Sequence, residues 1–268
     1  MRNKRIRALF PAVLCLLLFA LLFAGCGEEK GSAPDAGGNL SAGLSYVRAL
    51  EEKDPDNVDD ILKDRRRQEL LAMRDEKLRQ LQSGEISVWP MFQDYVIIGD
   101  SRAAGFTFLG TLDDSRNFAA YGNTISSIPD VLDAVHALNP SYIFVVFGLN
   151  DMLQAGCETP EAFAEQYRQA LMDLQAEFPD AKIYVNSIFP CTDPAFEKWE
   201  KWREAEAYSE AVAEMVPTTS CYYISNDNIT DFSPYFKDDG IHFTNDFYDI
   251  WAVNMIMAVY DSESEAVE

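Results

Sequence analysis

Residues 95–101, Tyr-Val-Ile-Ile-Gly-Asp-Ser, run from a short apolar stretch directly into a glycine, an acid and a serine. Four consecutive apolar residues of this kind are typical of a strand that is buried on both faces of a parallel sheet. The polar residues that follow then lie at the carboxyl end of the strand, where open α/β sheets bind ligands. The stretch therefore predicts a parallel sheet and the edge of that sheet at which a site lies.

Downstream of residue 95, short apolar runs alternate with segments of helical spacing. The predicted strands are Tyr95–Ile98, Phe118–Tyr121, Tyr142–Phe147, Lys182–Ile188 and Cys221–Ile224. The predicted helices are Ser127–Leu138, Pro160–Phe178, Pro194–Met215 and a last helix after Thr244. This alternation predicts an α/β fold in which helices cover both faces of a parallel sheet, a three-layer α/β/α arrangement.

Groups suited to acyl transfer follow the predicted strands or lie in the last loop. Ser101 stands at a strand-to-helix turn, which would raise its hydroxyl into the crevice as a nucleophile. Asp239 and His242 have two residues between them, so the carboxylate can orient the imidazole as a base. The Asn150 side chain and the Gly122 N–H, together with the Ser101 N–H, are candidate oxyanion donors. The simplest interpretation is acyl transfer through a covalent serine intermediate.

Each of these residues also has a plainer interpretation. Asn150 with the following acid is a common helix cap, and a lone glycine such as Gly122 is usually just a turn. Asp238 competes with its neighbour Asp239 for the orienting role. The second of the two histidines, His136, lies within a helical stretch, where a structural role is expected.

Taken together and in this order, the strings Gly-Asp-Ser, an isolated Gly, Gly-x-Asn-Asp and Asp-x-x-His resemble the SGNH (GDSL-like) hydrolases. The resemblance covers about residues 95–260 and implies a flavodoxin-like α/β/α fold and an esterase or acylhydrolase that uses no metal or other cofactor. It implies Ser101, His242 and Asp239 as the catalytic residues, with Ser101, Gly122 and Asn150 forming the oxyanion hole. The chain departs from the motif at Arg102, where the family usually has Leu. Arg102 is expected to bind a substrate carboxylate or to pair with a neighbouring acid.

The first 25 residues have the layout of a secretory signal, with four basic residues, no acid and a largely apolar run. The run ends in Leu-Phe-Ala-Gly-Cys, which resembles the lipobox of bacterial lipoproteins, although Phe23 stands where Leu is more usual. This resemblance implies lipidation of Cys26 and an extracytoplasmic protein anchored to the cell membrane. An uncleaved signal anchor is the alternative.

The composition is that of a globular chain with a strongly acidic surface. The 268 residues are 48% hydrophobic and carry a net charge of −22, which argues against nucleic acid and against direct adsorption to anionic lipid. Cys157, Cys191 and Cys221 show no metal-ligand spacing. Buried thiols are the expectation for these three residues, and one disulfide remains an alternative.

Four segments are predicted: a signal peptide over 1–25, a flexible linker over 26–43, a helical extension over 44–92 and the hydrolase domain over 93–268. The extension contains a predicted helix, Asn57–Gln82, with a thin apolar stripe. Such a stripe suits packing on the outside of the domain, and binding of a partner is the alternative.

The substrate is inferred from the predicted location and from aromatic residues. Phe196, Trp199 and Trp202 suit ordinary burial, and as an alternative Trp199 and Trp202 form a platform for sugar rings. Surface anchoring favours O-acetyl or other acyl esters on glycans as the substrate. A lipid ester, cleaved by a lipase or lysophospholipase, is the first alternative. A non-catalytic cell-envelope binding protein on the same fold is the second.

Overall fold

A computed structural model describes residues 43–45, 48, 55–108, 110 and 112–266. The chain divides into two compact units, 1–58 and 59–268, and most of the first unit lies outside the described residues. The predicted signal peptide, Cys26 and nearly all of the predicted linker therefore lie outside them too. No helix within the described ranges is both long and apolar enough to cross a bilayer.

The second unit contains a four-stranded parallel sheet. The strands are β1 (Tyr95–Gly99), β2 (Tyr142–Val146), β3 (Lys182–Asn186) and β4 (Tyr222–Ile224), and they lie in the order β1-β2-β3-β4. The first residues of β1 and β2 are register partners, so both strands end at the same edge. All five residues of β1 are buried, as the apolar run predicts.

The predicted strand Phe118–Tyr121 is only a short parallel pairing on the free side of β1. The Phe118 N–H donates to the Ile97 carbonyl at 2.7 Å and the Ala120 N–H donates to the Gly99 carbonyl at 3.1 Å. The chain thus pairs on one side of β1 and then crosses to β2 on the other side. A sheet of this order has its switch point, and its usual ligand crevice, at the end of β1.

Helices cover both faces of the sheet, which confirms the α/β/α layers. The α-helices are α3 (Pro55–Gln82), α4 (Ser101–Phe108), α5 (Leu132–Leu138), α6 (Pro160–Glu177), α7 (Asp193–Lys198), α8 (Ala205–Met215) and α9 (Asn245–Glu265). The 3₁₀ helices are η1 (Trp89–Met91), η2 (Asp114–Arg116), η3 (Ile125–Val131), η4 (Asp151–Leu153), η5 (Glu200–Glu204), η6 (Val216–Thr218) and η7 (Ser233–Tyr235).

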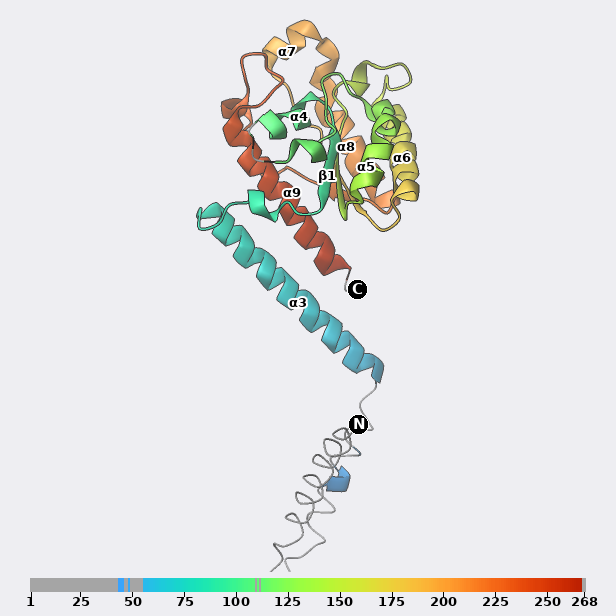
Figure 1. Cartoon of the computed structure of the whole chain (residues 1–268), viewed down its shortest axis with the longest axis vertical. Helices are drawn as coiled ribbons and strands as arrows, with labels where there is room; N and C mark the ends of the chain where they lie inside the picture. The colour runs from blue at the N-terminus through green and yellow to red at the C-terminus, as the bar shows by residue number, and fades with distance from the viewer. Residues whose placement is uncertain (1–42, 46–47, 49–54, 109, 111, 267–268) are drawn as a thin grey trace, which may run out of the picture. The chain divides into compact units, whose positions relative to one another are not determined.

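Alternate residues of β1 face two separate cores. Val96 and Ile98 point into a cluster with α5, α6 and α8, whereas Ile97 points into a cluster with α4 and α9. Figure 1 shows β1 between α9 on one side and α5 and α6 on the other. The second cluster is rich in aromatic residues; Trp251 of α9 is fully buried there and contacts the ring of Phe106 of α4.

Two predicted helices are broken in the structure. The predicted helix Ser127–Leu138 is a 3₁₀ segment followed by α5, and Pro129, which has no N–H to donate, lies inside the 3₁₀ part. The predicted helix Pro194–Met215 is interrupted at Trp199, whose backbone is extended. The predicted helices at 160–178 and after Thr244 are confirmed as α6 and α9.

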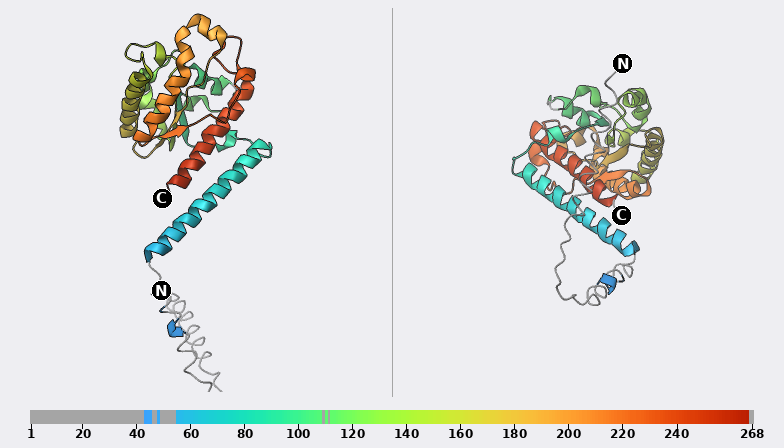
Figure 2. Two further views of the ribbon diagram at one scale, coloured as in Figure 1. Left: turned by 180° about the vertical axis from the view of Figure 1, so that it is seen from behind. Right: turned by 60° about the horizontal axis from the view of Figure 1, so that its bottom comes forward.

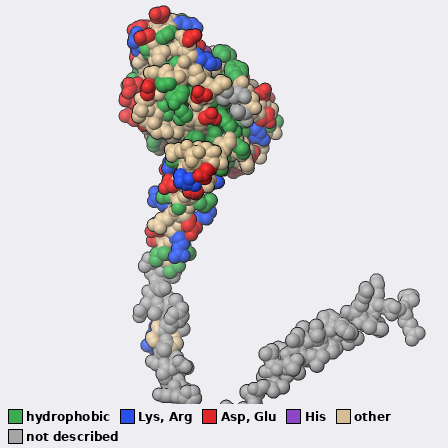
Figure 3. Space-filling view, turned by 90° about the vertical axis from the view of Figure 1, so that its left-hand side faces the viewer, with side chains coloured by type: hydrophobic (Ala, Val, Ile, Leu, Met, Phe, Trp, Pro, Cys, Tyr) green, Lys and Arg blue, Asp and Glu red, His purple; other side chains and the backbone are tan. Residues whose placement is uncertain are grey.

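Helix α3 confirms the predicted helix at 57–82 and runs antiparallel to α9 (Figures 1 and 2). Its C-terminal part packs on the domain: Leu78 and Leu81 contact the aromatic core, and Arg74 pairs with Asp261 of α9 at 3.0 Å. Farther toward its N-terminus, apolar side chains such as Ile61 and Leu62 are more than half exposed. Figure 3 shows acidic, basic and hydrophobic side chains interspersed along this helix.

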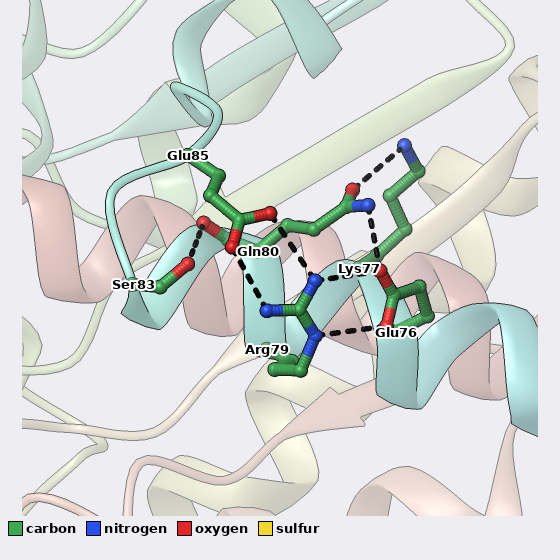
Figure 4. A network of polar contacts seen from close by, with 6 residues as sticks. All are labelled: Glu76, Lys77, Arg79, Gln80, Ser83 and Glu85. Carbon is green, nitrogen blue, oxygen red and sulfur yellow. Dashed lines mark hydrogen bonds and ion pairs between the residues drawn. The ribbon is translucent and has the colours of Figure 1, made fainter.

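A surface network fixes the turn that leaves α3. Arg79 donates to the carboxylates of Glu76 and Glu85, and Gln80 also donates to Glu76 (Figure 4). Hydrogen bonds from Arg79, opposed by a smaller cost of desolvation, lower the pKa of Glu76 to about 2. Gly84, with φ of +72°, completes the turn.

Candidate active site

Ser101 is the first residue of α4, and one residue, Asp100, separates it from the end of β1. Gly99 lets α4 lie this close to β1, because a Cβ at that position would lie 2.9 Å from the Ala103 Cβ of α4. The buried Asp100 carboxylate accepts the Arg102 N–H at 2.9 Å, and burial raises the pKa of this carboxyl. The serine hydroxyl therefore stands at the start of a helix and at the switch point of the sheet.

The loop before α9 brings the predicted acid and base together. Asp239 accepts the backbone N–H groups of Ile241 and His242, both at 2.9 Å, and its other oxygen lies 2.6 Å from His242 Nδ1. Burial opposes ionisation of Asp239, but the hydrogen bonds from the imidazole and the two N–H groups outweigh it and lower its pKa. Gly240, with φ of +67°, makes the turn. Asp239, and not Asp238, is thus the partner of the histidine.

His242 also contacts Ser101, which joins the three side chains into one chain of hydrogen bonds. His242 Nε2 lies 2.8 Å from Ser101 Oγ. An ionised carboxylate only accepts hydrogen bonds, so Nδ1 carries the proton and the neutral imidazole presents Nε2 as an acceptor for the serine hydroxyl. The arrangement can draw the proton from the serine.

The candidate oxyanion donors belong to loops beside Ser101. Gly122 has φ of +78° and follows the segment paired with β1, whereas Asn150 follows β2. The Asn150 amide donates one hydrogen to the Asn123 carbonyl at 3.0 Å, which ties the two loops together. An amide group has two hydrogens, so the second remains to bind an oxyanion.

The buried carboxylate of Asp151 forms hydrogen bonds to both of these loops. Asp151 accepts the Ile125 N–H at 2.8 Å and the Gly148 N–H at 3.0 Å, and so ties the two loops together. Burial raises the pKa of Asp151 to about 7, and the two N–H bonds oppose this shift only in part. Gly148, with φ of +138°, passes so close to Ile188 that a Cβ would lie 2.4 Å from its Cδ1.

Arg102 does neither of the two things expected of it. Its side chain is only 3% exposed, which removes it from the substrate, and among the described residues no acid forms an ion pair with its guanidinium. The guanidinium instead donates to three backbone carbonyls, those of Ile241 at 2.9 Å, Phe189 at 2.7 Å and Pro190 at 2.7 Å. It also donates to the sulfur of Cys191 at 3.2 Å. Because Ile241 precedes His242, this buried cation anchors the loop that carries the base.

The expected burial is confirmed for Trp202, which removes this residue from the alternative of a platform for sugar rings. Trp202 is buried and its indole N–H donates to the Leu149 carbonyl at 2.7 Å, so it holds the Asn150 loop and offers no face to a sugar. Trp199 is about half exposed, and its role stays a prediction. His136 pairs with Glu177 of α6, consistent with a structural role.

Two exposed aromatic residues that the sequence analysis did not select lie by the site. The ring of Tyr121 lies 5.6 Å from the imidazole of His242, and the ring of Phe108 stacks on Tyr121. The sequence feature that could have indicated them is the position of Tyr121, directly before the candidate oxyanion donor Gly122.

The three cysteines outside the N-terminal segment, Cys157, Cys191 and Cys221, are free and buried. Burial raises the pKa of each thiol, which keeps it protonated. Within the described part of the chain, no group of three or more His, Cys, Asp or Glu residues is arranged to hold a metal ion.

A serine, histidine and aspartate joined at the switch point of a parallel α/β/α sheet define the class of serine acylhydrolases. Comparison with protein families agrees: residues 97–250, more than half of the chain, match the GDSL-like Lipase/Acylhydrolase family. The chain belongs to this family and is a carboxylic ester hydrolase.

Several solved structures are similar to this chain at low sequence identity. A GDSL-like lipase from Bacteroides thetaiotaomicron is 15% identical with a TM-score of 0.51, covering 63% of this chain and 88% of its own. A family 3 carbohydrate esterase from Clostridium thermocellum is 16% identical with a TM-score of 0.47, covering 63% and 94%. A lipase/acylhydrolase from Enterococcus faecalis is 15% identical with a TM-score of 0.47, covering 63% and 95%. No curated protein matches the chain by sequence.

Proposed function

We propose that the chain is a serine esterase in which Ser101 is the nucleophile, His242 the general base and Asp239 the residue that orients it. The observation that carries the proposal is the continuous chain of hydrogen bonds from Asp239 through His242 to Ser101 Oγ. As Oγ attacks the ester carbonyl carbon, its proton passes to His242 Nε2 and a tetrahedral oxyanion forms. The Ser101 N–H, the Gly122 N–H and the Asn150 amide stabilise this oxyanion.

The intermediate then collapses and the bond from carbon to the alcohol oxygen breaks. His242 returns the proton to the departing alcohol, which leaves an acyl-enzyme on Ser101. A water molecule attacks this ester, again giving its proton to His242, and the acid is released as Oγ takes the proton back. No metal or further cofactor is required by this sequence of steps.

The substrate proposed is a short acyl ester, O-acetyl above all, on a glycan outside the cytoplasm. The net charge of −22 supports this choice over an ester in an anionic lipid surface, which the chain would repel. A lipid ester, as cleaved by a lipase or lysophospholipase, is the competing substrate. Release of acetate, butyrate and octanoate from matched chromogenic esters distinguishes the two.

The location outside the cytoplasm rests on lipidation of Cys26, which is part of the proposal. In a bacterial host, the full chain should fractionate with membranes and the Cys26→Ser variant should not carry the lipid. Mass spectrometry of the mature N-terminus tests this directly. An unprocessed N-terminus on membrane-bound protein would favour the signal anchor.

The catalytic roles are tested with the full-length chain in detergent and an activated acetyl ester. Ser101→Ala and His242→Ala should each lower kcat/KM by about 10³-fold or more, whereas the matched controls Ser115→Ala and His136→Ala should retain activity. Ser115 and His136 both have exposed surface partners outside the site. Equal turnover by the wild type and the two site variants would refute the proposal.

A further inference from the structure

A pair of exposed aromatic rings lies beside the imidazole of His242. Tyr121 is 67% exposed and Phe108, the last residue of α4, is 65% exposed. Their ring centroids are 6.4 Å apart with 28° between the planes, a stacked arrangement. The centroid of Tyr121 lies 5.6 Å from that of His242. Tyr121 therefore contacts both the ring of Phe108 and the imidazole of His242.

The exposure of these rings stands out among the described residues. Most other large apolar side chains that are exposed to a third or more lie on α3 or before it, and the remainder are single residues, Met172 and Trp199. Singly exposed apolar side chains are ordinary, whereas adjacent ones mark a binding surface. Phe108 and Tyr121 are an adjacent exposed pair, and Tyr121 contacts the histidine.

The position next to His242 decides which part of an ester such a surface contacts. In the proposed reaction, which this inference rests on, His242 Nε2 gives its proton to the departing alcohol. The alcohol oxygen must therefore lie against the imidazole, while the carbonyl oxygen points to Gly122 and Asn150. A ring packed beside the imidazole is therefore placed to contact the alcohol part of the ester.

We propose that Phe108 and Tyr121 form a stacking platform for a sugar ring whose hydroxyl carries the ester. A pyranose presents a flat face of C–H groups, which packs on the negative face of an aromatic ring, and the side chains of Phe108 and Tyr121 are both exposed enough to offer such a face. A phospholipid headgroup would bring negative charge to a chain of net charge −22. The platform thus selects the alcohol of the substrate, and the acyl length is selected elsewhere.

The test compares two triacetates that differ in the alcohol: methyl tri-O-acetyl-xylopyranoside, which has a sugar ring, and glycerol triacetate, which has none. Phe108→Ala and Tyr121→Ala should each lower the ratio of kcat/KM for the xyloside to kcat/KM for glycerol triacetate about 5- to 10-fold, through a higher KM for the xyloside. Tyr121→Trp should retain the preference. Met172→Ala, an exposed apolar residue on α6, is the matched control and should alter neither substrate.

Several outcomes would overturn the platform. Equal losses on both substrates in Phe108→Ala, which does not adjoin the oxyanion loop, would show a general role. Hydrolysis of glycerol triacetate but not of the xyloside by the wild-type enzyme would also contradict the platform. A loss of activity in the Phe108 and Tyr121 variants that is confined to octanoyl esters would contradict it too, because it would mean that the rings bind an acyl chain. Absence of any Ser101-dependent turnover of either triacetate would instead defeat the proposed function itself.

Discussion

The loops at the carboxyl edge of the sheet and the surface of α3 both hold many polar contacts, but these contacts differ in burial. At the sheet edge, Arg102 and Asp151 are nearly inaccessible, and their side chains bond to backbone groups or to a buried thiol, most of which lie in other loops. On α3, Arg79 and its partners are about half exposed and mostly close to one another in sequence. When a buried polar side chain is substituted, its buried partners lose their hydrogen bonds and water cannot reach them. When an exposed polar side chain is substituted, water replaces it as the hydrogen-bond partner.

This contrast predicts where substitutions matter. Variants at the sheet edge should alter activity or stability strongly, and variants on α3 should alter them little. The following changes test it in order of decreasing effect.

The largest effect is expected from Asp239→Asn. The amide can still fill the turn but cannot hold Nδ1–H as the carboxylate does, so kcat should fall about 10³- to 10⁴-fold while the fold is retained. Asp238→Asn is the matched control, because Asp238 adjoins Asp239 and is exposed. Steady-state kinetics with an acetyl ester measure both. Similar losses in the two variants would mean that Asp239 has no special role.

The next effect is expected from Arg102→Met. Methionine occupies similar volume but leaves the carbonyls of residues 189, 190 and 241 without their donor, at about 1–3 kcal/mol for each buried group. The free energy of unfolding should fall by about 3–5 kcal/mol, measured by urea denaturation with tryptophan fluorescence. Arg79→Met is the control and should unfold at the wild-type urea concentration. A stable Arg102→Met protein would remove the contrast between the two regions.

Features of the structure that depend on residues close in sequence can be predicted from the sequence, whereas contacts between distant segments cannot. Ser101, Asp239 and His242 were predicted together because strand ends of a parallel sheet converge and because the acid and base share one turn. The buried strands followed from apolar runs alone. Only the weakest strand, at 118–121, was overestimated, because its chain leaves the sheet after two hydrogen bonds.

Interactions between distant loops were beyond the sequence patterns. Nothing local to Arg102 shows that its guanidinium meets carbonyls 87 and 139 residues away. Trp199 and Trp202 both lie in the predicted helix at 194–215, but that helix is broken at Trp199, and Trp202 is buried whereas Trp199 is about half exposed. Phe108 and Tyr121 come together only when α4 and the Gly122 turn are placed in space.

A smaller effect, dependent on pH, is expected at Asp151. Its pKa is about 7 in the fold and ordinarily 3.8, so between these values the unfolded chain has lost a proton that the folded chain keeps. The free energy of unfolding should therefore fall as the pH rises from about 4 to about 7, by about 2–4 kcal/mol. Asp151→Asn cannot ionise and should lack this component.

Urea denaturation of the wild type and of Asp151→Asn at pH 4.5, 6 and 8 isolates the contribution of Asp151 to the free energy of unfolding, because all other groups titrate in both proteins. The stability of the wild type relative to the variant should decrease at each step. A constant difference between the two proteins would show that Asp151 stays ionised throughout, stabilised by its two N–H donors.

The smallest effect is expected where α3 meets α9. The pair of Arg74 and Asp261 is partly exposed, at 27% and 44% of the two side chains, so it should add no more than about 1 kcal/mol and weaken further in salt. A double-mutant cycle with Arg74→Ala and Asp261→Ala measures the coupling, and activity should not change in either variant. A coupling above about 2 kcal/mol would mean that α3 is held as firmly as the catalytic loops, because an exposed pair reaches that value only when a rigid structure orients both side chains.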